Sequence, residues 1–367
     1  MRVIILIMPI ETIHLDEGKY LNYLRSFTNQ NWVLCLGAGV CRGILPDWYN
    51  LTLKLVNSVF KKNWTSDEFK KISDEVGFSL DSWIQGCFNE LINHGKTLED
   101  FNKLLEDNLY EELLTKADSS NLRDALITLF EAPFQISKKN IFKLYDFFED
   151  NYSTTTLVQI VKALIDDSEN NKLPNSIITF NADSLLHSLL ILYSIKFNFD
   201  KTGEYVRPKI KFKKITRPFQ DYADNIPIFH LHGSLSPYDT KAIKNKDTRD
   251  SLIFLESSYT EIASQMHNWA QTNFLFNSQN SKLIFVGLSM SDPNIRRWLS
   301  WTNQTYINEL KQMTGGKAIA LPHLWIRTKA SSTDIQDFLD VSLRHMGVKI
   351  GIIENWNVLG ETLKKIM

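Results

Sequence analysis

The sequence is poor in cysteine, nearly neutral in net charge and without a long hydrophobic run. Its 367 residues include three cysteines, Cys35, Cys41 and Cys87, and no Cys-x-x-Cys pair. This pattern excludes a disulfide framework and a zinc ribbon, and we expect each cysteine to be a small buried hydrophobic side chain. Reduced cysteines are typical of a reducing compartment, so we expect a cytoplasmic protein.

The charge balance gives no sign of a nucleic-acid-coating protein. The chain has 41 basic and 42 acidic residues, a formal net charge of −1, whereas nucleic-acid-coating proteins carry excess positive charge. Direct nucleic-acid binding is therefore not expected. Residues 207–214 alternate cations with apolar side chains, which favours a solvent-facing edge strand, with a local nucleic-acid patch as the alternative.

No segment is long and apolar enough to be a membrane span. The apolar run 3–8 resembles a signal peptide, but it is too short for a signal core and polar residues follow Pro9. We expect no membrane association, and leave open whether the natural start is Met1 or Met8.

The arrangement of apolar residues predicts an α/β fold with a Rossmann-like parallel sheet. From residue 174 onward, short apolar runs alternate with helical patterns, which is typical of a parallel sheet covered on both faces. Between about 61 and 173 the apolar spacing is helical. We expect a single domain over 1–367, with a core at 20–60 and 174–367 and a helical insertion at about 61–173. The expected strands are 176–180, 226–231, 251–255, 282–286, 324–326 and 348–353, and the expected helices of the core include 185–195, 259–276 and 335–345.

The stretch from Asn31 to Trp48 contains a glycine turn. An apolar run ends in Gly37-Ala38-Gly39, and an apolar helix pattern follows from Leu51. In α/β proteins this order of strand, glycine turn and helix places backbone N–H groups against a dinucleotide pyrophosphate. A Gly-x-Gly turn alone is weak support, because any tight turn can require glycine.

Polar or glycine-rich segments also follow the other expected strands. A ligand of an open parallel sheet lies beyond the carboxyl ends of the strands, so these segments predict a site at that edge. They are Asn181-Ala182-Asp183, His232-Gly233-Ser234, Glu256-Ser257 and Gly287-Leu288-Ser289.

Four ordered motifs resemble the sirtuin-like family, and more narrowly its bacterial branch of NAD hydrolase effectors in antiphage defence. The motifs are G-A-G-V-x-R-G-x-x-P-x-W, I-I-T-F-N-A-D, F-H-L-H-G-S-L and F-V-G-L-S-M-S-D-P-N. The resemblance covers the core nearly end to end, and the insertion carries no motif. The chain lacks the two Cys-x-x-Cys zinc pairs of deacetylase sirtuins, Phe180 replaces their usual glutamine, and Cys41 stands where serine or alanine is usual.

The resemblance implies a substrate and a role for each matching residue. The substrate would be NAD, with no cofactor beyond it and neither zinc nor another metal. Asn181 and His232 would be catalytic. Asn181 would orient a water and the ribose, and His232 would act as the base. The NAD-binding residues would be Asp183 at the carboxamide or ribose, Gly37, Ala38 and Gly39 at the pyrophosphate, Arg42 as a phosphate clamp, and Gly287, Ser289, Asp292 and Asn294 on the adenosine side.

The same residues have structural interpretations that the sequence leaves open. Asn181 and Asp183 are residue types that cap helices, and a helix pattern begins near Leu185. Arg42 fits a surface charge as well as it fits a phosphate clamp. His230 and His232 lie two apart, so that both would project from one face of a strand, but no third residue with metal-ligand spacing accompanies them. We expect His230 to be packed.

The sequence therefore predicts an NAD(+) glycohydrolase that releases nicotinamide and ADP-ribose. The resemblance implies an NAD-depleting effector of abortive infection, kept silent until triggered. It also implies a homo-oligomer activated by a partner, such as a HerA-type ATPase, an Argonaute-type protein or a nucleotide signal. The alternatives are an NAD or ADP-ribose sensor without turnover and, third, a protein deacylase.

Overall fold

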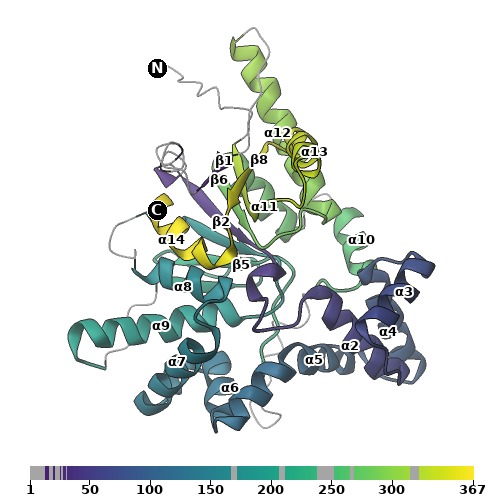
Figure 1. Cartoon of the computed structure of the whole chain (residues 1–367), viewed down its shortest axis with the longest axis vertical. Helices are drawn as coiled ribbons and strands as arrows, with labels where there is room; N and C mark the ends of the chain where they lie inside the picture. The colour runs from purple at the N-terminus through teal and green to yellow at the C-terminus, as the bar shows by residue number, and fades with distance from the viewer. Residues whose placement is uncertain are drawn as a thin grey trace.

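The computed structural model describes residues 13–15, 20, 25, 28–29, 31–166, 172–205, 211–237, 252–264, 268–314 and 322–367. Within them a central sheet is flanked by helices, and a group of helices extends to one side (Figure 1). The apolar run 3–8 lies outside the described residues. So do residues 207–210 of the stretch 207–214.

The sheet confirms the predicted Rossmann-like architecture. Its eight strands are all parallel and have the order β1-β8-β7-β6-β2-β3-β5-β4. Since β3 lies on one side of β2 and β6 on the other, the carboxyl ends of β2 and β6 form the topological switch point, where such sheets bind ligands. The strands are β1 (Ile13–His14), β2 (Trp32–Leu36), β3 (Ser176–Thr179), β4 (Phe212–Ile215), β5 (Ile226–His230), β6 (Lys282–Val286), β7 (His323–Thr328) and β8 (Val348–Ile353).

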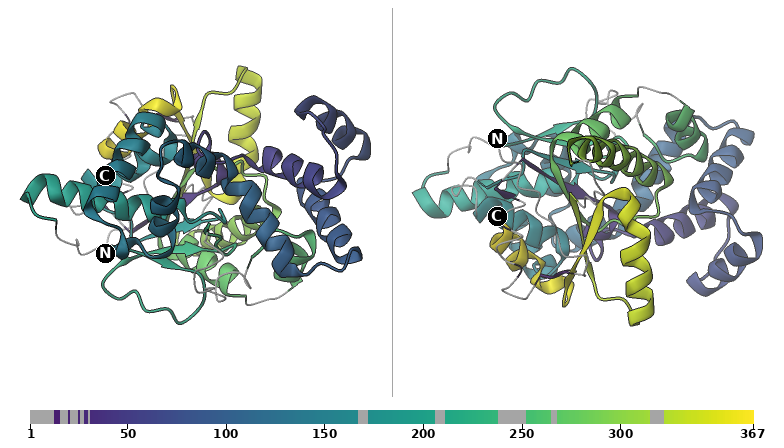
Figure 2. Two further views of the ribbon diagram at one scale, coloured as in Figure 1. Left: turned by 90° about the horizontal axis from the view of Figure 1, so that it is seen from below. Right: turned by 90° about the horizontal axis from the view of Figure 1, so that it is seen from above.

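Both faces of the sheet are covered, because successive side chains of each buried strand point to opposite sides. Val33 and Cys35 pack into the core beneath α11 (Trp269–Asn280), α12 (Pro293–Thr314) and α13 (Thr333–Leu343). Leu34 and Leu36 pack into the larger core, beneath α8 (Thr156–Asp166), α9 (Leu185–Thr202) and α14 (Leu359–Ile366). The two further views show these layers from below and above (Figure 2).

Within the described residues, the secondary-structure elements of the stretch predicted as an insertion are all helices. After α2 (Trp48–Phe60) come α3 (Ser66–Val76), α4 (Leu80–Asn93), α5 (Leu98–Ser119), α6 (Arg123–Glu131), α7 (Lys138–Tyr152) and α8. The residues before these helices explain several starts, because side chains of Thr65, Ser79, Thr97 and Ser137 accept from N3 amides. α4 packs on α2, whereas α8 packs on α9 and α14 over the sheet. The division into core and insertion stays a prediction.

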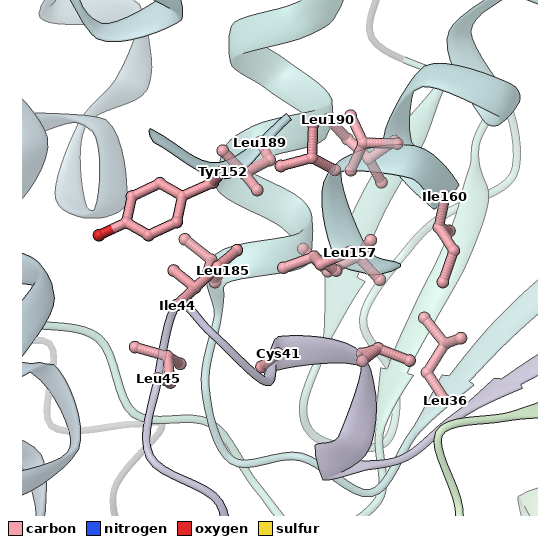
Figure 3. Packing of buried hydrophobic residues seen from close by; sticks show 14 of the residues in the cluster. Leu36, Cys41, Ile44, Leu45, Tyr152, Leu157, Ile160, Leu185, Leu189 and Leu190 are labelled. Atoms are coloured by element: carbon pink, nitrogen blue, oxygen red, sulfur yellow. The ribbon is translucent and has the colours of Figure 1, made fainter. Parts of the chain in front are cut away.

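The segment after the glycine turn is anchored in the larger core. Figure 3 shows Cys41 and Ile44 beside Leu157 of α8 and Leu185 of α9. Cys41 is 4% exposed and Ile44 3% exposed. All three cysteines are buried and free, as the sequence predicts.

One predicted strand is wrong, one predicted helix is two helices, and one strand was not predicted. Residues 252–255 form no strand. Phe254 and Leu255 are buried there, but the segment leads directly into α10 (Glu256–Ser264). The predicted helix 259–276 is divided between α10 and α11. β1 was not predicted, since two residues give no periodicity, whereas the predicted edge strand is confirmed in its described part by β4.

Among the described residues, no helix combines the length and apolar character needed to cross a membrane.

Candidate functional site

A cavity of about 1490 Å³ opens at the carboxyl ends of the central strands. Its lining includes ten of the eleven residues predicted from the sequence, and Asp183 is the exception. A cavity at the switch point, with a few converging polar groups, is where a ligand site is expected in this fold. The ten are Gly37, Ala38, Gly39, Arg42, Asn181, His232, Gly287, Ser289, Asp292 and Asn294.

The glycine turn after β2 packs directly against the loop after β6. The Gly37 amide donates to the Val286 carbonyl at 3.1 Å, and the Gly39 amide donates to the Gly287 carbonyl at 2.9 Å. A Cβ on Gly39 would lie 2.8 Å from that carbonyl oxygen. The glycines are therefore required by the contact between the two loops, independently of any ligand. Ala38, between them, is exposed and lines the cavity.

The side chain of Asn181 is held by Cys41. The Asn181 amide nitrogen Nδ2 donates to Cys41 Sγ at 3.5 Å, and the thiol donates to Asp183 Oδ2 at 3.3 Å. With Nδ2 engaged, the carbonyl oxygen Oδ1 has no hydrogen-bond partner within the part of the chain that the structure describes, although Asn181 is only 8% exposed. Buried polar atoms are normally paired, so this oxygen is an unsatisfied acceptor in a residue of the cavity wall.

Asp183 lies behind the cavity wall, 7% exposed. Its Oδ1 accepts from the Leu185 amide at 3.0 Å, where α9 begins. Burial raises the pKa of the carboxyl group, against the lowering effect of the hydrogen bonds from Leu185 and Cys41. The helix-start interpretation thus fits Asp183, and its contact with a ligand remains a prediction.

His232 lies in the cavity wall between two aromatic rings. Its ring centroid is 5.3 Å from that of Phe180 and 5.4 Å from that of Tyr259. Burial lowers its pKa, and this outweighs the raising effects of the Asp292 charge and the Phe180 carbonyl. The imidazole is therefore neutral near pH 7 and keeps a lone pair with which to accept a proton.

His230 occupies a different environment. It is fully buried, and burial lowers its pKa to about 3, with further lowering by the nearby Lys214 and His187. The expectation that His230 and His232 project from one strand face is wrong, because β5 ends at His230 and His232 lies in the turn beyond it. His230 is packed, as expected.

Arg42 lies at the rim of the cavity. Its side chain is 80% exposed, and its guanidinium lies 3.8 Å from the Asp47 carboxylate. An exposed pair of this kind contributes little to stability. The structure leaves both interpretations of Arg42 open.

Tyr110 of α5 connects the helical stretch to two loops of the site. Its hydroxyl donates to the Leu235 carbonyl at 2.8 Å and accepts from the Ser184 amide at 3.1 Å, and the residue is fully buried. These loops follow β5 and β3 and carry His232 and Asn181.

Sequence reasoning missed the contribution of the helical stretch to the cavity. Asp81 of α4 lines it. Three lining residues of other elements were also not predicted, namely Tyr259 of α10, Arg297 of α12 and Arg327 of β7. The pKa of Asp81 is raised to about 6, first by burial and then by the charges of Asp292 and Glu256. No sequence pattern points to Asp81, because the spacing of apolar residues does not show which helix of the stretch 61–173 faces the sheet.

Comparison with known proteins gives one family match. Residues 175–336 match the model described as SIR2-like domain, which covers less than half of the chain. No curated protein matches the chain. The matched range runs from β3 into α13 and contains Asn181, His232 and Gly287, but not the glycine turn. It supports a sirtuin-like relationship and an NAD-related function.

Proposed function

We propose that this protein is an NAD(+) glycohydrolase, which cleaves NAD to nicotinamide and ADP-ribose. The observation that carries the proposal is that the unpartnered Asn181 Oδ1 and the neutral His232 belong to the wall of one cavity, in the loops that follow the neighbouring strands β3 and β5. A hydrogen-bond acceptor and a base are the two groups needed to orient and deprotonate a water.

The order of strands arranges the cavity for a dinucleotide. From β7 through β6, β2 and β3 to β5 there are four strand spacings, or roughly 19 Å at about 4.8 Å each. The two glycine loops lie in the middle of this span and would face the pyrophosphate, while the Gly37 and Gly39 amides themselves donate to the Val286 and Gly287 carbonyls. Asn181 and His232 lie at the β3 and β5 end, which would receive the nicotinamide ribose.

The reaction then follows from these positions. The bond between C1′ of the ribose and the nicotinamide nitrogen breaks, and its electron pair returns to the ring, which leaves as neutral nicotinamide. The ribose passes through an oxocarbenium-like state, as in other glycosidic cleavages. Water held by Asn181 Oδ1 adds to C1′, and His232 accepts its proton and releases it to solvent, so one NAD(+) and one water give nicotinamide, ADP-ribose and a proton.

Nicotinamide release from NAD(+) by the full-length chain tests this function. We expect Asn181→Ala and His232→Ala each to lower the rate by about 100-fold or more while the far-UV circular dichroism stays unchanged. His94→Ala is the matched control, since His94 is an exposed residue near the end of α4, outside the cavity lining. Full activity of both site variants would contradict the assignment, and binding of NAD without products under activating conditions would favour the sensor.

We propose further that the enzyme is a triggered effector of antiphage defence. This rests on the resemblance of the four motifs and on the SIR2-like match. Uncontrolled NAD loss is lethal, so activity would await an activating partner or nucleotide signal, with a homo-oligomer as the expected form. Cellular NAD during phage infection, in strains with the wild-type chain or Asn181→Ala, tests the role. An equal NAD level in both strains would contradict it.

A further inference from the structure

The cavity has an acidic wall to which the helical stretch contributes. Asp81 of α4, Glu256 of α10 and Asp292 before α12 all line it. Their charges act on one another, because Asp292 and Glu256 both raise the pKa of Asp81. The helix starts at which the three carboxylates lie favour negative charge, but the raised pKa of Asp81 shows that the repulsion between them is offset only in part, so a cationic ligand would be favourable here.

The geometry of this wall is fixed by helix packing and by hydrogen bonds, including one from the Trp48 side chain to the Asp81 carboxylate. α10 packs on α4, and the Ser257 amide donates to Gln85 Oε1 at 3.2 Å. Asp81 lies one helical turn before Gln85, and Glu256 directly precedes Ser257, so this bond brings the two acidic residues to the same side. Asp292 is held separately, because its Oδ1 accepts from the Asn294 amide at 2.7 Å at the start of α12.

The acidic wall adjoins the proposed catalytic pair. Tyr259, whose ring packs against His232, is within the electrostatic influence of both Asp81 and Asp292. The charge of Asp292 also acts on His232 itself. An independent sign of a ligand here is the Oδ1 atom of Asn181, buried and unpartnered at the wall of the same cavity.

The same cavity is also lined by positively charged side chains. Arg297 of α12 and Arg327 at the end of β7 both line it. Arg297 donates to Asn294 Oδ1 at 3.0 Å, and the Arg327 guanidinium lies over the Trp325 ring. The cavity wall thus carries charges of both signs.

We propose that Asp81, supplied by the helical stretch, determines specificity for the oxidised dinucleotide by facing its positively charged nicotinamide ring. NAD(+) carries a pyridinium cation at one end and an anionic pyrophosphate in the middle. NADH lacks the cation, and ADP-ribose lacks the whole ring. The acidic wall would therefore favour NAD(+) over both, and would keep favouring the cation as its charge passes to the ribose in the oxocarbenium-like state.

This inference rests on the proposed function, and binding measurements separate the two. We would titrate NAD(+), NADH and ADP-ribose into the full-length chain carrying His232→Ala, with and without Asp81→Asn, by isothermal calorimetry at pH 7.5. Removing one charge that faces the pyridinium should weaken NAD(+) binding roughly five- to tenfold. NADH and ADP-ribose should change less than about twofold, because neither carries the cation.

Asp74→Asn provides a matched control. Asp74 is an exposed acidic residue of α3 outside the cavity lining, so its loss removes the same charge from the helical stretch without changing the wall. Glu256→Gln is a second variant of the wall and should weaken NAD(+) selectively, to a smaller extent, because Glu256 is exposed.

Each outcome bears on the proposal. Selective weakening of NAD(+) by Asp81→Asn supports it. Equal weakening of all three ligands, a larger effect on NADH, or no effect in either wall variant overturns it, even if the wild-type chain releases nicotinamide. If the chain without the Asp81 substitution binds none of the three ligands, the proposed function fails and this inference fails with it.

Discussion

The Gly39 amide donates to the carbonyl of Gly287 at 2.9 Å, joining two loops almost 250 residues apart in the sequence. Gly287 has a φ of +68°, and a Cβ there would lie 2.6 Å from the Val40 amide nitrogen. The glycine turn of the sequence is thus one half of a backbone contact, and its partner comes from the other side of the switch point.

Gly39→Ala and Gly287→Ala should each destabilise the protein by more than about 2 kcal/mol, because the new methyl group meets backbone atoms that cannot move aside and Gly287 also has a positive φ. Chemical denaturation measures this change in the free energy of unfolding. Gly86→Ala is the control: Gly86 lies within α4 with no atom within 4 Å of its added Cβ, and it should stabilise by up to about 1 kcal/mol. Equal effects at all three positions would contradict the contact.

Cys41→Ala should lower nicotinamide release by about tenfold, because the Asn181 amide loses the sulfur that orients it and a small displacement of a catalytic group is costly in rate. Cys41→Ser retains both a donor and an acceptor at this position, and its activity should stay within about threefold of the wild type. Steady-state rates of the two variants at equal folded fraction decide the point. Identical rates would show that Cys41 does not position Asn181.

Asp292→Asn should move the acidic limb of the pH–rate profile to lower pH. His232 acts in its neutral form, burial already lowers its pKa, and the Asp292 charge opposes that lowering. Removing the charge lowers the pKa further, so activity persists into more acidic solution. Asparagine can still cap α12. The rate between pH 4.5 and 8 provides the measurement, and an unmoved limb would exclude the interaction.

Asp81→Asn should make the protein more stable above about pH 6 and leave it unchanged near pH 4. The folded-state pKa of Asp81 is about 6, above the value of about 3.9 in an unfolded chain. As the pH rises between these values, the unfolded state releases its proton first, so the free energy of unfolding falls. Asparagine removes this destabilisation, and we expect a gain of about 1 kcal/mol at pH 7.5, after allowing for solvent screening of a partly exposed group.

Thermal unfolding at pH 4.5 and 7.5 tests the Asp81 prediction, with Asp74→Asn as the control variant. A wild type as stable as Asp81→Asn at both values would show that Asp81 is not destabilising. If Asp81→Asn both stabilises the protein and weakens NAD(+) binding, Asp81 is a residue whose function is retained at a cost in stability.

The strand ends were predictable because a parallel sheet brings the carboxyl ends of its strands to one edge, whatever connects them. That rule placed Asn181, His232 and Gly287 at one cavity. It could not place Asp81, because packing decides which helix of a long helical stretch faces the sheet. The run 251–255 was mistaken for a strand, since a short apolar run has the same composition in a packed loop.

The buried Tyr110 hydroxyl has a consequence for how the molecule assembles. It satisfies a carbonyl 125 residues and an amide 74 residues away along the chain. While α5 is undocked, both backbone groups lack this partner, and an unpaired buried group is unfavourable by about 1–3 kcal/mol. Burial of these two loops and docking of α5 are therefore energetically coupled, because the loops can be buried without an unpaired group only when the Tyr110 hydroxyl is in place.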